Sequence, residues 1–368
     1  MRAMVMAAGL GTRLHPLTQL VPKPMVPVVN RPALYHILRL LAGHGIRDVV
    51  VNLHHFPDTI RSYFGDGGEL GIRLRYSFEE ELLGTAGGVK NNEEFLTKEG
   101  TLLVMSGDSL TDIDLEALLE AHHASGTPAT LALKQVDDPS QYGVVVQDEE
   151  GCVHSFQEKP SREEALSHLC NCGIYVLEPE ALARVPAGTF YDFGKQLWPE
   201  MIAAGERIGT YEVTGYWNDV GDLGEYLNSN FAALRGEVRV EMPSEAPTTS
   251  VWIDKHALVK SEAAVSGPVL IGSDCWIEEG AKVTGPVVLG GGCVVEAGAS
   301  VQRSVVWGGA YLAEGSSVNG SIVGRAARVG SGARIEDSVL GERCLVEEGV
   351  RVAGRSVDAR TEVRSEVE

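Results

Sequence analysis

A periodic pattern of aliphatic residues runs through the C-terminal third of the chain. From Val259 to Val301 a Val, Ile or Leu recurs at every sixth residue, and the segments beginning at Ser304 and Ser321 then repeat 17 residues apart. Gly, Ala and Ser fill many of the positions between. A fixed hexapeptide period is typical of a parallel β-helix, in which short strands turn aliphatic side chains inward and small residues form the corners. The pattern therefore predicts a parallel β-helix over residues 251–368.

The first 235 residues show a different pattern, in which strand-like and helix-like segments alternate. The expected strands are 4–6, 48–53, 101–105 and 129–133, and the expected helices are 34–42 and 115–122. This alternation predicts an α/β domain with a Rossmann-like, mostly parallel sheet and helices on both faces. Ligands of such sheets bind at the carboxyl ends of the strands.

The stretch over residues 236–250 fits neither pattern. It is rich in Pro, Ser, Thr and Glu and has few apolar residues, so it is expected to be a linker. A chain of 368 residues also exceeds what one compact core usually accommodates. We therefore expect an α/β domain over 1–235, a linker over 236–250 and a β-helix domain over 251–368.

Composition excludes several classes of partner. The net charge of −20 disfavours binding to nucleic acid, because most of the surface repels phosphate backbones. No apolar run is long enough for a membrane span, and the short run over residues 3–10 leads directly into a glycine-rich turn, as a buried first strand would. Six cysteines do not indicate a disulfide framework, so we expect reduced, mostly buried thiols and a cytoplasmic protein.

Two N-terminal motifs indicate phosphate binding. Residues 7–14 (AAGLGTRL) form a glycine-rich turn after the first expected strand, and glycines let backbone N–H groups approach phosphates. The turn is neither a P-loop nor a Rossmann fingerprint. Lys23 then lies between Pro22 and Pro24, whose rings restrict the backbone on either side. A lysine in such a stiff segment is suited to meeting a phosphate.

These two motifs resemble the N-terminal block of the sugar-1-phosphate nucleotidyltransferase family, and the further blocks of that family follow in the same order. They are Gly84-Thr85-Ala86-Gly87-Gly88, Gly107-Asp108, Tyr142-Gly143-Val144, Glu158-Lys159-Pro160, Asn171-Cys172-Gly173 and Trp217-Asn218-Asp219-Val220-Gly221. The resemblance covers about residues 1–230, and a C-terminal left-handed β-helix of hexapeptide repeats is a common partner domain in the family. The departures, Ala8 for a frequent Gly and Cys172 for a frequent Ala, are sterically mild.

The resemblance implies that a nucleoside triphosphate and a sugar-1-phosphate react to give a nucleotide sugar and pyrophosphate. In that scheme Arg13 and Lys23 hold the triphosphate and the departing pyrophosphate, and Asp108 and Asp219 hold Mg²⁺. The implied nucleotide-binding residues are Ala8, Gly9, Gly11, Thr12, Glu80, Gly84, Thr85, Ala86 and Gly87, and those for the sugar phosphate are Gly143, Glu158, Lys159 and Asn171.

The implied chemistry agrees with the residues that the chain offers. A sugar-1-phosphate is mostly a dianion at neutral pH, since its second pKa is about 6. It needs no general base and no enzyme nucleophile, and the sequence shows no convincing Ser-His-Asp or Cys-His arrangement. The task is to bring two anions together and to stabilise the charge that develops as pyrophosphate leaves.

For the substrates we expect GTP and mannose-1-phosphate. The block from Leu83 to Gly88, preceded by the glutamates 79–81, resembles guanylyltransferases with this two-domain layout. A carboxylate such as that of Glu80 accepts hydrogen bonds from the N1–H and N2–H donors of guanine. Thymidylyl- and uridylyltransferases that act on glucose-1-phosphate share nearly every block and remain an alternative.

Two further alternatives concern the architecture. A noncatalytic regulatory subunit would keep this layout but lose the charged residues, all of which are present here. An acyltransferase β-helix usually carries a histidine base, whereas His256 is the last histidine and precedes the regular coils. We therefore expect the coils to mediate homo-oligomer formation and residues 1–243 alone to retain the reaction.

Overall fold

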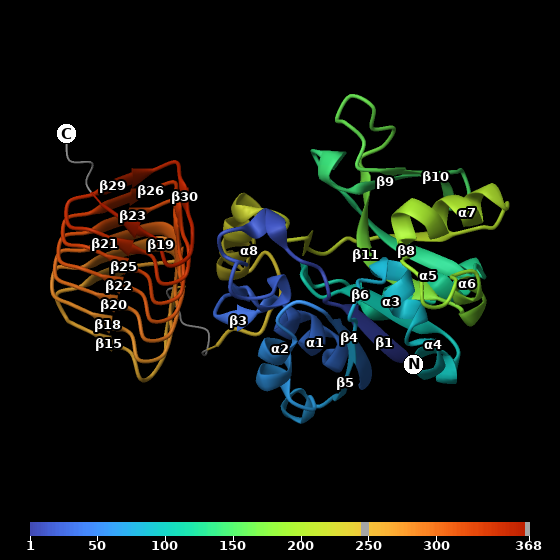
Figure 1. Ribbon diagram of the computed structural model, residues 1–368, viewed down its shortest axis with the longest axis horizontal. Coiled ribbons are helices and arrows are strands. Elements are labelled where there is room, and N and C mark those ends of the chain that lie inside the picture. The colour runs from blue at the N-terminus through green and yellow to red at the C-terminus, as the bar shows by residue number, and fades with distance from the viewer. Residues whose placement is uncertain (244–249, 365–368) are drawn as a thin grey trace. The chain divides into compact units, whose positions relative to one another are not determined.

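The computed structural model describes residues 1–243 and 250–364 (Figure 1). Residues 244–249, within the expected linker, lie outside the described residues. The chain forms two compact units, and neither is continuous in sequence.

The first unit consists of Met1–Leu10 and Leu34–Asp219, and the second joins Gly11–Ala33 to the chain from Val220 onward. Residues 11–33, which include the second half of the glycine-rich turn and Lys23, thus belong to the unit that contains the C-terminal coils. The domain boundaries expected at 235 and 250 stay a prediction.

The first unit is built on a nine-stranded sheet with the path β10-β9-β11-β6-β1-β4-β5, in which β8 pairs with β11 and β12. Its strands are β1 (Arg2–Met6), β4 (Asp48–Leu53), β5 (Arg73–Phe78), β6 (Leu102–Ser106), β8 (Ala129–Gln135), β9 (Gly143–Gln147), β10 (Val153–Glu158), β11 (Leu169–Leu177) and β12 (Gly209–Glu212). The strands β6, β1, β4 and β5 are parallel, whereas β11 is antiparallel to β6, β8 and β9. The expected α/β fold is confirmed, with a mixed sheet.

Helices connect these strands. They are α1 (Ala33–Gly43), α2 (Pro57–Phe64), α3 (Gly84–Lys90), α4 (Glu93–Leu96), α5 (Leu115–Ser125), α6 (Pro179–Ala183), α7 (Trp198–Ala203) and, in the second unit, α8 (Leu223–Arg235). Of these, α1 and α5 confirm the two expected at 34–42 and 115–122. α5 begins where the Asp114 carboxylate accepts hydrogen bonds from the amides of Glu116 and Ala117, and it ends at Gly126 in the left-handed conformation. These caps limit the helix to the segment that separates β6 from β8.

Parallel pairing aligns the carboxyl ends of the central strands. Met6, the last residue of β1, lies opposite Asn52 of β4 and Ser106 of β6. The strands are filled with buried Val, Leu and Met side chains up to this level, so the sheet is rigid where its polar residues begin. The edge made by these strand ends is where the ligand site of such a sheet is expected.

The second unit contains a parallel β-helix. Its strands are β14 (Val251–Ile253), β15 (Leu258–Val259), β16 (Ala264–Ser266), β17 (Val269–Ile271), β18 (Trp276–Ile277), β19 (Lys282–Leu289), β20 (Val294–Val295), β21 (Ser300–Val306), β22 (Tyr311–Leu312), β23 (Ser317–Asn319), β24 (Ile322–Val323), β25 (Arg328–Val329), β26 (Arg334–Glu336), β27 (Val339–Leu340), β28 (Leu345–Val346), β29 (Arg351–Ala353), β30 (Ser356–Val357) and β31 (Glu362–Val363). The pairings between successive coils are parallel, and the periodic aliphatic residues form one buried core. The β-helix expected from the hexapeptide period is confirmed.

A serine ladder accompanies the shortening of the repeat from 18 to 17 residues. Arg303 alone fills the corner that Gly285-Pro286 fills one coil earlier, and Ser304 follows it, opposite Val287. The Ser304 hydroxyl accepts a hydrogen bond from the amide of Ser321, whose own hydroxyl accepts one from the amide of Ser338, both at 3.1 Å. The buried hydroxyls thus satisfy backbone donors at the tighter corner.

The six cysteines are buried, three in each unit, and all are free thiols, as expected.

Candidate active site

A cavity of about 320 Å³ lies at the strand ends of the first unit. We call it the strand-end cavity. Its lining includes the predicted site residues Ala8, Gly9, Gly84, Thr85 and Asp108, together with Met6, Asn52, Glu79, Leu82, Ser106, Phe190 and Asp192. The structure therefore brings the first glycine-rich turn, the second glycine-rich block and the aspartate after β6 around one space.

Glycine is required where the second block, residues 84–88, crosses the segment 189–193. Gly84 has a φ of 73°, and a Cβ placed on it would lie 2.6 Å from the carbonyl oxygen of Tyr191. A Cβ on Gly87 would lie 2.7 Å from the carbonyl oxygen of Thr189. The Thr85 hydroxyl then donates a 2.9 Å hydrogen bond to Oδ2 of Asp192. Close backbone contact and this side-chain bond hold the block beside the cavity.

The buried carboxylate of Glu79 also holds residues around the cavity in place. Glu79 accepts hydrogen bonds from Asn52 Nδ2 at 2.8 Å and from the amide of Leu83 at 3.0 Å, which occupies both of its oxygens. Asn52 Oδ1 in turn accepts a 2.7 Å hydrogen bond from the amide of Ala7. Glu79 and Asn52 therefore tie the two glycine-rich segments together.

Glu79, and not the predicted Glu80, lines the strand-end cavity, whereas the side chain of Glu80 is exposed. The sequence presents the glutamates 79–81 as one run, from which Glu80 was the expected acceptor for the base. The signal that could have separated them is Asn52, a polar residue inside the apolar run DVVVNL, because a buried amide needs a polar partner. Asp192 had no comparable signal.

The two predicted metal-binding aspartates flank a short ribbon. β7 (Leu110–Thr111) pairs antiparallel with β13 (Trp217–Asn218), with Asn218 opposite Leu110. The register therefore carries Asp219 to the end of the ribbon at which Asp108 lies, two residues before β7. Asp112 fixes the ribbon, since its Oδ1 accepts a 2.7 Å hydrogen bond from the amide of Tyr216.

A glycine between β6 and Asp108 lets the chain pass close to β1. A Cβ on Gly107 would lie 2.9 Å from Cγ1 of Val5 and 3.0 Å from the carbonyl oxygen of Met6. The Gly107 amide also donates a 2.8 Å hydrogen bond to that oxygen. Asp108 is consequently fixed directly after the strand, at the cavity.

The predicted sugar-phosphate residues gather around β9, β10 and β11. Gly143 pairs with Glu158 across β9 and β10, and the amide of Lys159 donates a 3.0 Å hydrogen bond to the carbonyl oxygen of Tyr142. Lys159 has a φ of 47°, an uncommon conformation for a residue with a side chain. Such strain persists where the surrounding structure enforces it, often at functional sites.

Charges around Glu158 shift its titration. Desolvation by the surrounding protein and the nearby negative charge of Asp192 raise the pKa of the Glu158 carboxyl, while Lys159 and Lys195 oppose that shift. The fourth predicted residue, Asn171, donates from Nδ2 to the Tyr175 hydroxyl at 2.8 Å, and its Oδ1 accepts from the amide of Gly173 at 3.0 Å. Its carbonyl oxygen retains a second lone pair for a ligand.

The remaining predicted residues lie in the second unit. A Cβ on Gly11, which has a φ of 64°, would lie 2.6 Å from Cβ of Lys23. Gly11 also accepts a 2.8 Å hydrogen bond from the Thr18 hydroxyl. Lys23 is buried, whereas Thr12 and Arg13 are exposed in a short 3₁₀ turn. The glycine-rich turn and the Pro-Lys-Pro segment are therefore neighbours within this unit.

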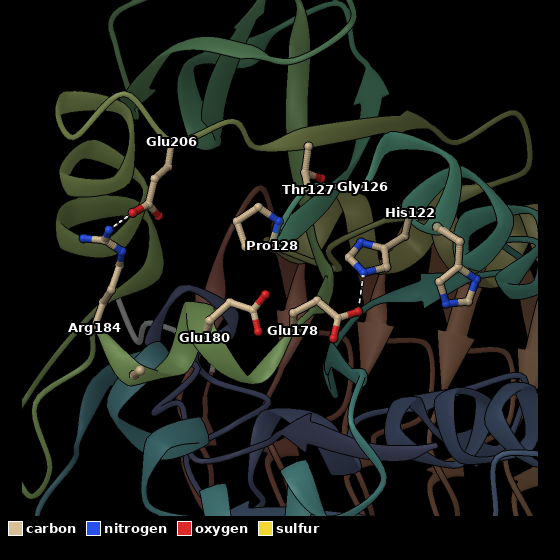
Figure 2. A pocket seen from close by; sticks show the side chains of 10 residues that line it. His122, Gly126, Thr127, Pro128, Glu178, Glu180, Arg184 and Glu206 are labelled. Atoms are coloured by element: carbon tan, nitrogen blue, oxygen red, sulfur yellow. Dashed lines mark hydrogen bonds and ion pairs between the residues drawn. The ribbon is translucent and has the colours of Figure 1, made fainter.

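A larger cavity, of about 590 Å³, lies elsewhere in the first unit and is shown in Figure 2. Figure 2 shows the ring of His122 turned toward Glu178, with Nε2 of the ring 3.1 Å from Oε1 of the carboxylate, and Arg184 paired with Glu206. Glu180 adds a further carboxylate to the lining. None of the predicted site residues lines this cavity, whereas five of them line the strand-end cavity, which is therefore the better candidate for the active site.

No group of three or more His, Cys, Asp or Glu side chains in residues 1–243 and 250–364 is arranged to hold a metal ion by itself. Over the same residues, no helix has the length and apolar character needed to cross a membrane. Any metal in the strand-end cavity would therefore need ligand atoms from a substrate.

Most of the chain is similar to known proteins. Residues 2–235 match the family model described as nucleotidyl transferase, and residues 265–368 match the one described as the GMPPB C-terminal domain. A UTP–glucose-1-phosphate uridylyltransferase of Synechocystis sp. is 36% identical over 293 residues, which cover 76% of each chain. A mannose-1-phosphate guanylyltransferase of Mycobacterium tuberculosis is 36% identical over 273 residues, which cover 73% of each chain.

Among solved structures, one assigned as a glucose-1-phosphate thymidylyltransferase from Bacillus anthracis has the same fold. It superposes with a TM-score of 0.58 at 23% identity and covers 65% of this chain and 97% of that chain.

Proposed function

The chain belongs to the nucleotidyl transferase family, and we propose that it joins a nucleoside triphosphate to a sugar-1-phosphate with release of pyrophosphate. The observation that carries this proposal is the strand-end cavity, where two glycine-rich turns and Asp108 surround one space. Glycine-rich turns suit phosphates, and the family match gives the class of reaction. GTP and mannose-1-phosphate are the substrates that we propose first.

The reaction needs positioning more than proton transfer. An oxygen of the sugar phosphate attacks the α-phosphorus of the triphosphate, and the bond from that phosphorus to the bridging oxygen of pyrophosphate breaks. The nucleophile is already ionised at neutral pH, so no residue has to remove a proton. Holding the two anions in line and neutralising the charge on the leaving group account for the rate.

We assign Asp108 and Asp219 to a magnesium site. Two carboxylates completed by phosphate oxygens form the donor set that this hard cation prefers, and the ribbon β7–β13 brings both residues to one end. When bound, the ion supplies positive charge to the phosphate oxygens. The role of this chain's residues is to fix that charge beside the glycine-rich turns.

We assign the sugar phosphate to the residues around β9 to β11 and the triphosphate to Arg13 and Lys23. Lys159 is the cation for the sugar phosphate, and Glu158 and Asn171 are the acceptors for sugar hydroxyls. Glycine is required at position 143, which lies opposite Glu158, because a Cβ there would collide with the ring of Phe156.

For the base, we propose that Glu80 accepts hydrogen bonds from guanine. Support comes from the guanylyltransferase relative of Mycobacterium tuberculosis and from the description of the matched C-terminal domain. The uridylyltransferase of Synechocystis sp. supports the second candidate, glucose-1-phosphate with a pyrimidine triphosphate. Pyrophosphate release from GTP, ATP, UTP and dTTP, each tested with mannose- and glucose-1-phosphate, separates the two. Release from none of the pairs would reject the proposed reaction.

We further propose that the protein is a cytoplasmic homo-oligomer. One sheet of the β-helix carries a column of outward-facing residues in register, in which Leu258 lies beside Trp276 and Arg328 beside Leu345. Leu258, Trp276 and Leu345 are exposed. Exposed apolar side chains on a rigid face are suited to contact with a second copy.

A further inference from the structure

We propose that the β-helix positions the triphosphate-binding loop, residues 11–33, and that Tyr226, Asn230 and Trp307 are positioning residues for it. The inference rests on the proposed function, because it assumes that Arg13 and Lys23 in this loop bind the triphosphate. All of the contacts that support it lie within the second unit.

Tyr226 of α8 connects the coils to the loop. Its side chain is fully buried, its hydroxyl donates a 2.6 Å hydrogen bond to the carbonyl oxygen of Pro27, and it accepts a 2.8 Å hydrogen bond from Nε1 of Trp307. Burial raises the pKa of the Tyr226 phenol well above its usual value, so the hydroxyl keeps its proton and remains a donor. One side chain thus links a residue of the coils, through α8, to the backbone just after Lys23.

Asn230, one turn further along α8, holds the next part of the loop. Its Oδ1 accepts a 2.9 Å hydrogen bond from the amide of Val29, and its Nδ2 donates to the carbonyl oxygen of Tyr226 at 2.9 Å. Val29 and Asn30 have φ values of 41° and 66°. Such conformations are costly for residues with side chains and persist where other contacts enforce them, as the buried amide of Asn230 does here.

The coils also contact the loop directly. Asn30 Nδ2 donates a 2.8 Å hydrogen bond to the carbonyl oxygen of Leu289 in β19, and a Cβ on Gly272 would lie only 3.1 Å from that nitrogen. At the other end of the stack, Gln19 Oε1 accepts a 2.8 Å hydrogen bond from the amide of Ala359, which follows β30. The loop is therefore fixed to an early coil and to a late one.

Lys23 lies between these two attachment points in the sequence, after Gln19 and before Asn30. The attachments lie four coil spacings apart, roughly 19 Å at about 4.8 Å per coil. A loop held at both ends loses little conformational entropy when it binds a ligand, and that loss opposes binding in a mobile loop. The coils therefore favour the binding of the triphosphate without contributing a residue that touches it.

The test compares two tyrosine variants of the full chain. Tyr226→Phe removes only the hydroxyl and leaves the Pro27 carbonyl and the Trp307 N–H without that partner. Tyr76→Phe is the matched control, since its hydroxyl donates a 2.8 Å hydrogen bond to the carbonyl oxygen of Gly65, far from the loop in sequence. We expect Tyr226→Phe to raise the KM for the nucleoside triphosphate about tenfold and to leave the KM for the sugar phosphate unchanged.

A second readout does not depend on activity. Hydrogen exchange at the amides of Val29 and Asn30 should be faster in Tyr226→Phe than in the wild type, and unchanged in Tyr76→Phe. If the wild type releases no pyrophosphate with any substrate pair, the proposed function fails, while unchanged exchange in Tyr226→Phe would show that the loop needs no such anchor. Faster exchange with unchanged triphosphate KM and kcat, or an equal rise in both KM values, would overturn the positioning role.

Discussion

The hydroxyl of Tyr142 donates a 3.2 Å hydrogen bond to Oδ1 of Asp219. The Tyr142 ring also contacts Trp217 edge-on, with centroids 5.4 Å apart, and Nε1 of Trp217 donates a 3.1 Å hydrogen bond to the carbonyl oxygen of Cys172. Three segments that are distant in sequence therefore orient one carboxylate. Such support matters if Asp219 binds Mg²⁺ as proposed, because the position of the charge would determine how well the ion stabilises the reaction.

The metal site gives the first prediction. Asp108→Asn and Asp219→Asn preserve side-chain size and remove the charge that we assign to Mg²⁺ binding. Each should lower turnover by at least about 100-fold, equivalent to roughly 2.7 kcal/mol of barrier, with the fold intact by circular dichroism. The control is Asp66→Asn, an exposed acid outside the candidate site. A folded Asp108→Asn protein with near-normal magnesium-dependent turnover would refute the assignment.

The second prediction separates the two lysines. Lys159→Ala should chiefly raise the KM for the sugar phosphate, whereas Lys23→Ala should impair triphosphate use and turnover, because charge on pyrophosphate grows in the transition state. Steady-state kinetics with each substrate varied in turn measures both effects. If both variants raised the KM of the same substrate alone, the roles given to the two lysines would be wrong.

The third prediction concerns the base and uses adjacent glutamates as a pair. Glu80→Gln should reduce the preference for GTP over ATP in kcat/KM by about tenfold, since one acceptor for the guanine donors is lost. Glu79→Gln should instead impair all four triphosphates alike, because Glu79 ties Asn52 to the amide of Leu83. Loss of base preference in Glu79→Gln and not in Glu80→Gln would move the base contact to Glu79.

The origin of these assignments shows what the sequence can and cannot predict. The β-helix followed from the hexapeptide period, because each inward position accepts only an aliphatic side chain and the pattern is local. The α/β fold followed from the alternation of strands and helices, and Asp108 lies at a strand end, where ligands bind in such sheets, although its role stays a prediction. The role of Glu79 depends on Asn52, which is 27 residues away, and no local pattern joins the two.

The grouping of residues 11–33 with the coils was even harder to predict from the sequence. It depends on hydrogen bonds such as that from Tyr226 to Pro27, which joins residues 199 positions apart. The expectation that residues 1–243 alone retain the reaction is therefore replaced by a different one. We now expect such a shortened chain to lose triphosphate affinity, because Trp307 and Leu289 would be missing from the loop's attachments.

The fourth prediction follows from the raised pKa of Glu158. A carboxyl with a raised pKa takes up its proton at a higher pH than an ordinary glutamate, so Glu158 loses its charge as acceptor earlier when the pH falls. The KM for the sugar phosphate should therefore rise on the acid side. Lys195→Gln removes a charge that opposes the shift, so the acid limb should move to higher pH.

The comparison between the wild type and Lys195→Gln cancels the titration of the sugar phosphate itself, which is common to both. Lys98→Gln, at an exposed lysine far from β10 in sequence, is the control. Ionisation of Glu158 changes the stability of the fold in the opposite direction to ionisation of an acid in a salt bridge. A raised folded-state pKa means that ionised Glu158 disfavours folding above its unfolded pKa, so Glu158→Gln should be more stable than the wild type at neutral pH and equal to it in acid. If the rise in KM at low pH occurred at the same pH in Lys195→Gln as in the wild type, the electrostatic explanation would be wrong.

The last prediction tests self-association through the outward column of the β-helix. Shortening the chain is unsuitable, because it would also remove the attachments of the loop, so the test uses a surface substitution in the full chain. Trp276 lies in register between Leu258 and Val294, and 41% of its surface is exposed. Trp276→Glu places a charge beside the apolar Leu258 and Val294, and like charges on two copies would repel across a twofold contact.

We expect light scattering to show a smaller assembly for Trp276→Glu than for the wild type at equal concentration, with kcat and both KM values retained. Lys255→Glu, at an exposed position between β14 and β15 and outside the column, is the control for added negative charge and should keep the wild-type assembly. If Trp276→Glu keeps that assembly as well, the copies associate through another surface. If it changes assembly and turnover together, association itself supports the active site, and the division between a contact face and a catalytic unit would not hold.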